Sequence, residues 1–101
     1  MPERLAALIA QAGLQPTRYR LEVLAQFCRF GPTPRGWQDA YAALRQRGVP
    51  VAYSSVTRLC VSLVRAGLLQ SVPSGGRQYT LRPTAPVIAA WQDVDRADPP
   101  S

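Results

Sequence analysis

Apolar side chains recur at the i, i+3 and i+4 spacing of an amphipathic helix in four successive stretches of the chain. The stripes are Leu5, Leu8, Ile9 and Ala12; Leu21, Leu24, Ala25 and Cys28; Ala40, Tyr41 and Leu44; and Val56, Leu59, Cys60 and Leu63. A glycine follows each stripe within a few residues, and glycine readily adopts the left-handed conformation that ends many helices. Thr17 and Gly36 are suited to cap the second and third helices. The pattern predicts four short helices.

Two short segments around a glycine-rich turn follow the fourth stripe. Residues 68–72 and 77–81 flank the turn 73–76, which consists of proline, serine and two glycines. These residue types favour tight turns, and glycine tolerates positive φ, so the segments predict a two-stranded β-hairpin. Beyond it, residues 86–95 could form one further helix, in which Trp91 lies on the apolar side.

Four helices followed by a hairpin predict an α+β fold, the winged helix-turn-helix. We place this domain at residues 1–82 and treat residues 83–101 as a tail. The third and fourth helices, separated by Pro50, form the helix-turn-helix. In this fold the fourth helix, residues 53–66, is the recognition helix that lies in the major groove of DNA, and the hairpin, residues 68–81, is the wing.

The fourth helix has a polar side with an unusual composition. At 100° per residue this side carries Ser54, Arg58, Val61 and Arg65, and hydroxyl residues flank it. It therefore offers hydroxyls and guanidinium groups without acidic partners. Short donors near the start of a helix and an arginine one turn later suit a groove of DNA.

The charge of the chain favours a polyanionic partner. All 12 basic residues are arginine, there is no lysine or histidine, and the net charge is +6. Residues 13–82 contain ten arginines against Glu22 and Asp39, a balance of +8. Arginine pairs with phosphate and guanine through a planar fork. A GC-rich genome is an alternative explanation for the missing lysine, but it does not explain why the charge gathers in the predicted domain.

The same inventory argues against catalysis and metal binding. A nucleophile needs a base within hydrogen-bond reach, and the carboxylates of the predicted domain, Glu22 and Asp39, lie on different helices. Cys28 and Cys60 are on separate stripes, which leaves too few ligands for a structural zinc or a sensory iron site. We therefore predict that the protein is not an enzyme and holds no metal and no cofactor.

The location of the protein is predicted from what its segments lack. No apolar run approaches the ~20 residues that span a bilayer. The N-terminus begins with Met, Pro and Glu, without the basic start of a secretory signal. We predict a cytoplasmic protein with no membrane partner, in which Cys28 and Cys60 are buried free thiols; a disulfide or redox pair is the alternative.

Residues 13–81 resemble the N-terminal DNA-binding domain of the ferric uptake regulator (Fur) family, bacterial sensors of metals and peroxide. The motifs that carry the resemblance are Gly13-Leu14-Gln15-Pro16-Thr17 with Arg20, Leu21 and Leu24; Asp39, Tyr41, Leu44, Arg47 and Gly48; Val51-Ala52-Tyr53-Ser54-Ser55-Val56-Thr57-Arg58; and Ala66-Gly67-Leu68-Leu69 with Gly75, Gly76, Arg77, Tyr79 and Leu81. They occur in the order of the family with nearly its spacing. The resemblance implies a transcription regulator that binds double-stranded DNA.

The resemblance and the polar helix side together predict a set of DNA-contacting residues. This set is Gln15, Arg18, Tyr19, Arg20, Tyr53, Ser54, Ser55, Thr57, Arg58 and Arg77. The chain departs from the family at three positions: Ala52 replaces a capping serine, Thr57 a tyrosine that touches thymine methyl groups, and Gln15 a basic residue that enters a minor groove. Family members continue after the wing into a metal-binding dimerisation domain. We expect this protein to lack that domain and to bind DNA without metal sensing.

Two functions of different classes follow from the sequence. The first is a DNA-binding transcription regulator. The second is a protein-interaction module that keeps the winged-helix shape and meets another protein through Val61, the Trp91 region or the arginine surface. Hydroxyl and arginine residues on the fourth helix favour the first. The Trp91 helix could pack within the chain, or it could form a homodimer or a contact with a partner protein.

Overall fold

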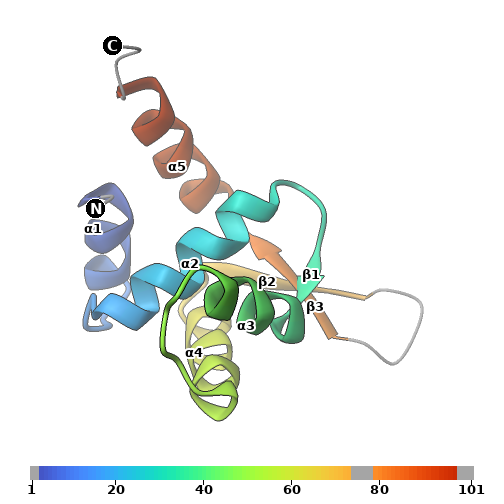
Figure 1. Ribbon diagram of the computed structural model, residues 1–101. Helices are drawn as coiled ribbons and strands as arrows, with labels where there is room; N and C mark the ends of the chain where they lie inside the picture. The colour runs from blue at the N-terminus through green and yellow to red at the C-terminus, as the bar shows by residue number, and fades with distance from the viewer. Residues whose placement is uncertain (1–2, 74–78, 98–101) are drawn as a thin grey trace.

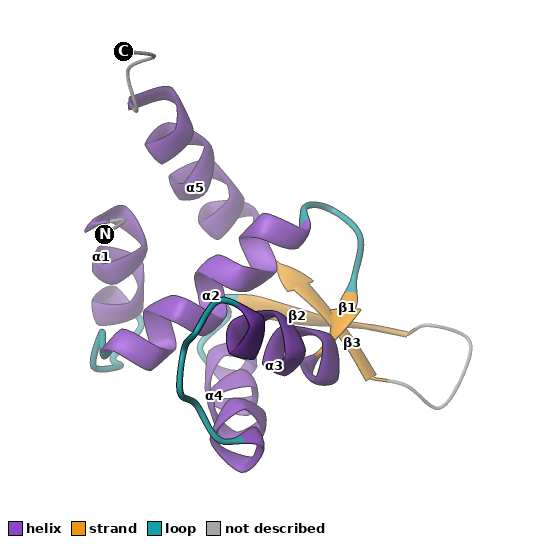
Figure 2. Cartoon of the chain, viewed as in Figure 1, coloured by secondary structure: helices purple, strands orange, loops and turns teal. Residues whose placement is uncertain are grey.

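The computed structural model describes residues 3–73 and 79–97, with side chains described as far as residue 92. The elements are α1 (Glu3–Gln11), α2 (Arg18–Phe30), β1 (Arg35–Gly36), α3 (Trp37–Gln46), α4 (Tyr53–Arg65), β2 (Leu69–Pro73), β3 (Tyr79–Pro83) and α5 (Ala85–Ala97) (Figure 1). The predicted α+β winged helix, with four helices before a hairpin, is confirmed. Figure 2 shows the strands gathered at one side of the helices.

The ends of α2 illustrate how local sequence sets the helix boundaries. Thr17 is the N-cap, and its hydroxyl accepts a bond from the amide of Arg20 at 3.4 Å. Gly31 ends the helix with φ +80°, and its amide donates to the carbonyl of Cys28 at 3.0 Å. A residue with a Cβ would be strained at that φ. Both boundaries agree with the sequence prediction.

The sheet contains a strand that the sequence pattern did not predict. Its order is β1-β3-β2, and β1 pairs antiparallel with β3 through Arg35 opposite Leu81 and Gly36 opposite Thr80. A strand of two residues is too short to show alternation. The pairing of β2 with β3 extends to Pro83, opposite Leu69, so the hairpin runs two residues past the predicted end at residue 81. The turn and Arg77 lie outside the described residues.

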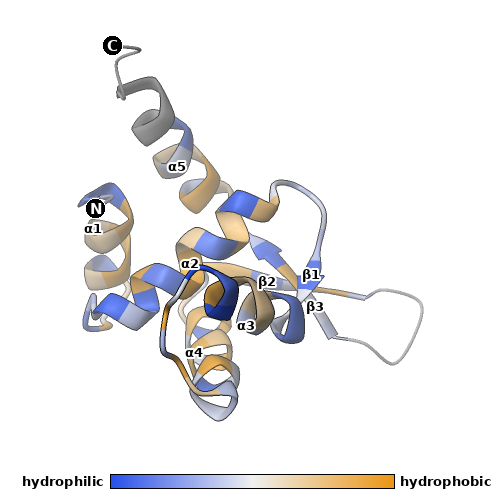
Figure 3. Ribbon diagram, in the orientation of Figure 1, coloured by the Kyte–Doolittle hydropathy of each residue, from blue (hydrophilic) through white to orange (hydrophobic). Residues whose placement is uncertain are grey.

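The core is built from the predicted stripes and lies around α2, which contacts α1, α3, α4, β3 and α5. The predicted stripe residues that are buried are Leu5, Ile9, Leu21, Leu24, Ala25, Cys28, Ala40, Leu44, Val56, Cys60 and Leu63, while Leu8, Ala12, Tyr41 and Leu59 are partly buried. Figure 3 shows the apolar colours on the inner sides of the helices. Gln26 is the buried polar side chain of the described core, and its Oε1 accepts a bond from Arg47 Nη1 at 3.3 Å.

Helix α5 packs within the chain. It contacts α1 and α2 (Figure 1), and Val87 and Ala90 belong to the buried core. The Arg29 guanidinium of α2 lies 5.4 Å from the ring centroid of Trp91, a cation–π geometry. The predicted helix 86–95 is therefore present, slightly longer than expected, and it packs against α1 and α2 within the chain, which is one of the arrangements that the sequence left open. No helix in the described part of the chain is long and apolar enough to cross a membrane.

The two cysteines are buried and neither is part of a disulfide, as predicted. Burial raises the pKa of Cys60 from 9.0 to about 12. The thiol of Cys60 lies on the core side of α4 with Val56 and Leu63, where a thiolate would lose its hydration.

We expect Cys60 to make the protein less stable at alkaline pH. The folded state keeps a thiol proton that the unfolded chain releases above about pH 9. The stability that the buried, neutral thiol gives the folded state is therefore complete below that pH and is lost as the pH rises toward 12. In this window the free energy of unfolding should fall by up to about 1.4 kcal/mol per pH unit from this group. Urea unfolding at pH 8 to 11 should show a shallower decline for Cys60→Ala. Parallel declines in the two proteins would contradict the expectation.

Candidate nucleic-acid interface

The outer side of α4 carries the residues expected there. Ser54, Arg58, Val61 and Arg65 are exposed, and Val61 is 45 % exposed. The opposite side of the helix is buried in the core. Among the described residues, neither Arg58 nor Arg65 has a hydrogen-bond or ion-pair partner in the structure. Two guanidinium groups of one helix side therefore face solvent with their donors unused.

The start of α4 lacks a side-chain cap. Ala52 is the N-cap, with φ −79° and ψ 150°, and cannot accept a bond from the first amides of the helix. Thr57, half-buried, donates its hydroxyl hydrogen to the carbonyl of Tyr53 at 3.2 Å. The Thr57 oxygen can therefore serve an outside partner as an acceptor only.

The start of α2 meets α4 across a hollow of about 530 Å³. Its lining residues are Thr17, Tyr19, Arg20, Ser55, Arg58, Leu59 and Ser62. Tyr19 also approaches the turn before α4, with its hydroxyl 3.5 Å from the carbonyl oxygen of Pro50. The fold thus brings together four residues from two separate segments that the sequence predicted as DNA contacts: Tyr19, Arg20, Ser55 and Arg58.

The basic residues before and within α2 have different surroundings. Arg20 Nη1 donates to the carbonyl of Gln15 at 2.8 Å, which uses part of this guanidinium inside the protein. Its Nε is buried without a partner among the described residues. Arg18 is exposed and lies over the ring of Tyr19 at 5.7 Å from the centroid. Gln15 is also exposed.

A second hollow, of about 580 Å³, lies on the other side of Arg58. It is lined by the loop that follows α1, through Ala12 and Leu14, and by the outer residues of α4 as far as Arg65. Arg58 and Ser62 line both hollows. Ser62 Oγ is a second buried polar atom without a partner among the described residues. Arg58 therefore stands between two concave surfaces.

An aromatic cluster, formed by Trp37, Tyr41, Tyr53 and Tyr79, joins α3, α4 and β3. Trp37 Nε1 donates to Tyr53 Oη at 2.7 Å. The rings of Tyr41 and Tyr53 meet edge to face at 5.3 Å, and those of Trp37 and Tyr79 lie 5.8 Å apart. Of these residues, the predicted set of DNA contacts included only Tyr53. Tyr41 and Tyr79 were named for the motifs that resemble the Fur family, and nothing in the sequence pattern pointed to Trp37.

Arg77 lies outside the described residues, so its predicted contact with DNA stays a prediction. In the part of the chain that the structure describes, no three histidine, cysteine or acidic side chains come together in a group that could hold a metal ion.

Comparison with known proteins shows a likeness of fold. No protein-family model matches the chain, and no curated protein does. The ferric uptake regulator of Vibrio cholerae has a similar structure, with a TM-score of 0.74 over 79 % of this chain at 19 % sequence identity. The ferric uptake regulator of Pseudomonas aeruginosa, solved with manganese, has a TM-score of 0.69 over 74 % of this chain at 24 % identity. The chain spans 61 % and 56 % of those two proteins. The likeness establishes a Fur-like winged-helix fold for this chain.

Proposed function

We propose that the protein is a DNA-binding transcription regulator that places α4 in the major groove of duplex DNA. The observation that carries this proposal is the outer side of α4, where Arg58 and Arg65 are exposed without partners among the described residues. Unpaired guanidinium groups need no internal ion pair to be broken before they bind phosphate or guanine. In helix-turn-helix proteins the second helix of the motif enters the groove, and here that helix is α4.

The surroundings of α4 support the same orientation. Arg20 of α2 lies across the hollow that Arg58 also lines, and the exposed Arg18 is the first residue of the same helix. A helix in the major groove has phosphate backbones on both sides, and basic residues that flank it are suited to contact them. We propose Gln15, Arg18, Tyr19, Arg20 and the wing residue Arg77 for these positioning contacts. Ser54, Ser55, Thr57 and Arg58 are the residues proposed to meet base edges.

A regulator that reads two half-sites needs two copies. We propose that a second copy, or a partner protein, would meet the Trp91 region of α5. Ile88 of this helix is 39 % exposed and lies next to the buried Val87. The core contacts of α5 leave this outer side open to solvent, and the interaction stays a proposal.

The test is a titration of a fluorescent duplex of random sequence, followed by a duplex enriched from a random library. We expect the wild-type protein to bind both at low ionic strength. Arg58→Ala should weaken the binding free energy for the enriched duplex by about 1 to 3 kcal/mol, because a base contact is lost. The difference in affinity between the enriched and the random duplex should therefore become smaller. The readout is the dissociation constant from fluorescence anisotropy.

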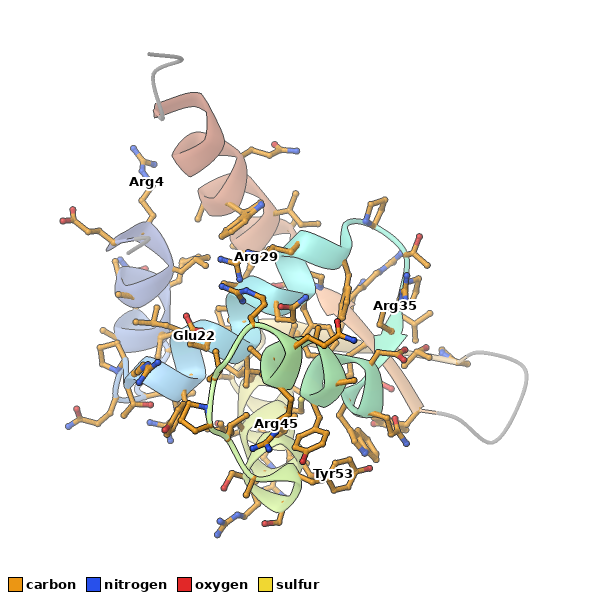
Figure 4. The ribbon with its side chains drawn as sticks, viewed as in Figure 1. Arg4, Glu22, Arg29, Arg35, Arg45 and Tyr53 are labelled. Carbon is orange, nitrogen blue, oxygen red and sulfur yellow. The ribbon has the colours of Figure 1, made fainter. Side chains whose placement is uncertain are left out.

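Arg4→Ala is the matched control. Figure 4 shows Arg4 on α1, at the end of the molecule away from α4. This variant removes the same charge, so it should weaken binding only slightly and equally for both duplexes. If the wild-type protein binds neither duplex at low salt, the proposed function is wrong and the interaction module takes its place. If the two variants behave alike, α4 does not read sequence.

A further inference from the structure

The hydroxyl group of Tyr53 has a defined hydrogen-bonding role in the free protein. It accepts a bond from Trp37 Nε1 at 2.7 Å. An indole N–H can only donate, so the phenol oxygen must be the acceptor. The hydrogen of the Tyr53 hydroxyl is then left for another partner. Among the described residues, none accepts it.

The ring of Tyr53 is held from two sides. Tyr41 of α3 packs edge to face against it, with an interplanar angle of 86°. Trp37, which holds the hydroxyl, is itself packed against Tyr79 of β3. Tyr53 is the first residue of α4, so its backbone is fixed by the helix as well. A donor held this way loses little conformational entropy when it binds.

The position of Tyr53 leaves its donor accessible. The residue is 43 % exposed although its ring is packed. Figure 4 shows Tyr53 on the lower side of the molecule, at the start of α4, with Arg45 of α3 on the same side. Arg45 is exposed. An anionic partner on this side of the molecule would meet the neutral donor of Tyr53 and the positive charge of Arg45.

We propose that Tyr53 donates its hydroxyl hydrogen to a phosphate oxygen of the DNA backbone and that Trp37 is the positioning residue for this contact. The inference rests on the proposed function. A phosphodiester oxygen accepts hydrogen bonds and has none to donate, which matches a hydroxyl whose acceptor role is already filled. A backbone contact carries no sequence information, so Tyr53 fixes the register of α4 on the duplex.

Tyr53→Phe tests the contact, because it keeps the ring and removes only the hydroxyl. We expect binding to random and enriched duplexes to weaken by the same factor, about tenfold. A neutral donor displaces no counterion, so the slope of the logarithm of affinity against that of salt concentration should be unchanged. Arg18→Ala provides the contrast, since it removes a cation proposed to neutralise a phosphate and should flatten this slope.

Trp37→Phe tests the positioning role. It should weaken binding severalfold, and Tyr53→Phe combined with Trp37→Phe should bind no worse than Tyr53→Phe alone, since the indole acts through the hydroxyl. In the free protein, proton NMR should show two indole N–H signals, of which Trp37→Phe removes one. That signal should shift in Tyr53→Phe while the signal of Trp91 stays in place.

The outcomes separate this inference from the proposed function. If the wild-type protein does not bind duplex DNA, the proposed function fails. If it binds and Tyr53→Phe binds equally well, only the contact of Tyr53 is refuted. A loss of affinity for the enriched duplex alone would also refute the phosphate contact, because Tyr53 would then read a base. Thermal unfolding of each variant, measured by circular dichroism, shows whether the fold is intact at the temperature of the titration.

Discussion

Duplex DNA will bind about a hundredfold more weakly when the salt concentration rises from about 50 to 200 mM. The estimate takes four arginines, namely Arg18, Arg20 and Arg77 of the proposed backbone contacts and the exposed Arg65 of α4, as each neutralising one phosphate. Each such contact releases counterions and contributes about −0.9 to the slope of the logarithm of affinity against that of salt, so four give a slope of about −3.6. Anisotropy titrations of a random duplex at five or six salt concentrations measure it.

The control for this slope is Arg4→Ala, which should leave it nearly unchanged because Arg4 is away from α4 in Figure 4. An affinity that does not depend on salt would mean that the arginines contribute no phosphate contacts. Binding would then have to come from apolar or neutral polar groups, and the proposed docking of α4 would be wrong.

Phe27→Ala will destabilise the fold by about 3 to 5 kcal/mol. Phe27 is 1 % exposed and lies in α2, the helix that contacts α1, α3, α4, β3 and α5. Its ring also meets Phe30 edge to face at 5.9 Å. Loss of the ring leaves a cavity in the middle of the core, and small domains are stable by only about 5 to 15 kcal/mol.

Urea unfolding followed by circular dichroism measures this loss. The matched control is Val61→Ala in α4, which also shortens an apolar side chain but at a residue that is 45 % exposed. Its free energy of unfolding should change by less than about 0.5 kcal/mol. Similar effects of the two substitutions would show that α2 is not the centre of the core.

The helices could be predicted from sequence because each has a stripe of apolar residues that ends near a glycine or proline. Thr17 and Gly31, for example, are strong local signals, and their effect on α2 does not depend on the rest of the fold. The polar side of α4 followed from the same periodicity, since the residues opposite Val56 and Leu63 had to face outward. Local patterns therefore carried most of the fold prediction.

The contacts of the candidate site could not be predicted in this way. β1 consists of Arg35 and Gly36, which form a strand only because β3 lies beside them. The bond between Trp37 and Tyr53 joins residues 16 positions apart, and neither residue type specifies the other. The hollows beside Arg58 depend on how α1 and α2 approach α4. Tertiary geometry, which no periodicity encodes, determines all three features.

The predicted boundary after residue 82 shows a related limit. The sequence suggests a domain and a separate tail, because the wing completes the winged helix. In the structure Val87 and Ala90 of α5 belong to the same core as α1 and α2. The division into a domain and a tail stays a prediction. The described residues of α5 pack against residues on the other side of the predicted boundary.

The placement of Trp37 between Tyr53 of α4 and Tyr79 of β3 has a consequence for the shape of a bound duplex. Tyr79 pairs with Pro73 at the end of the hairpin next to its turn, so this end of the wing and the start of α4 share one side chain and cannot turn independently of each other. The distance between a groove that receives α4 and a backbone that meets this end of the wing would then be set by the protein. A duplex of a different groove width would have to deform to fit, and the ease of that deformation depends on base sequence. The protein would thereby discriminate between sequences at base pairs that no side chain touches.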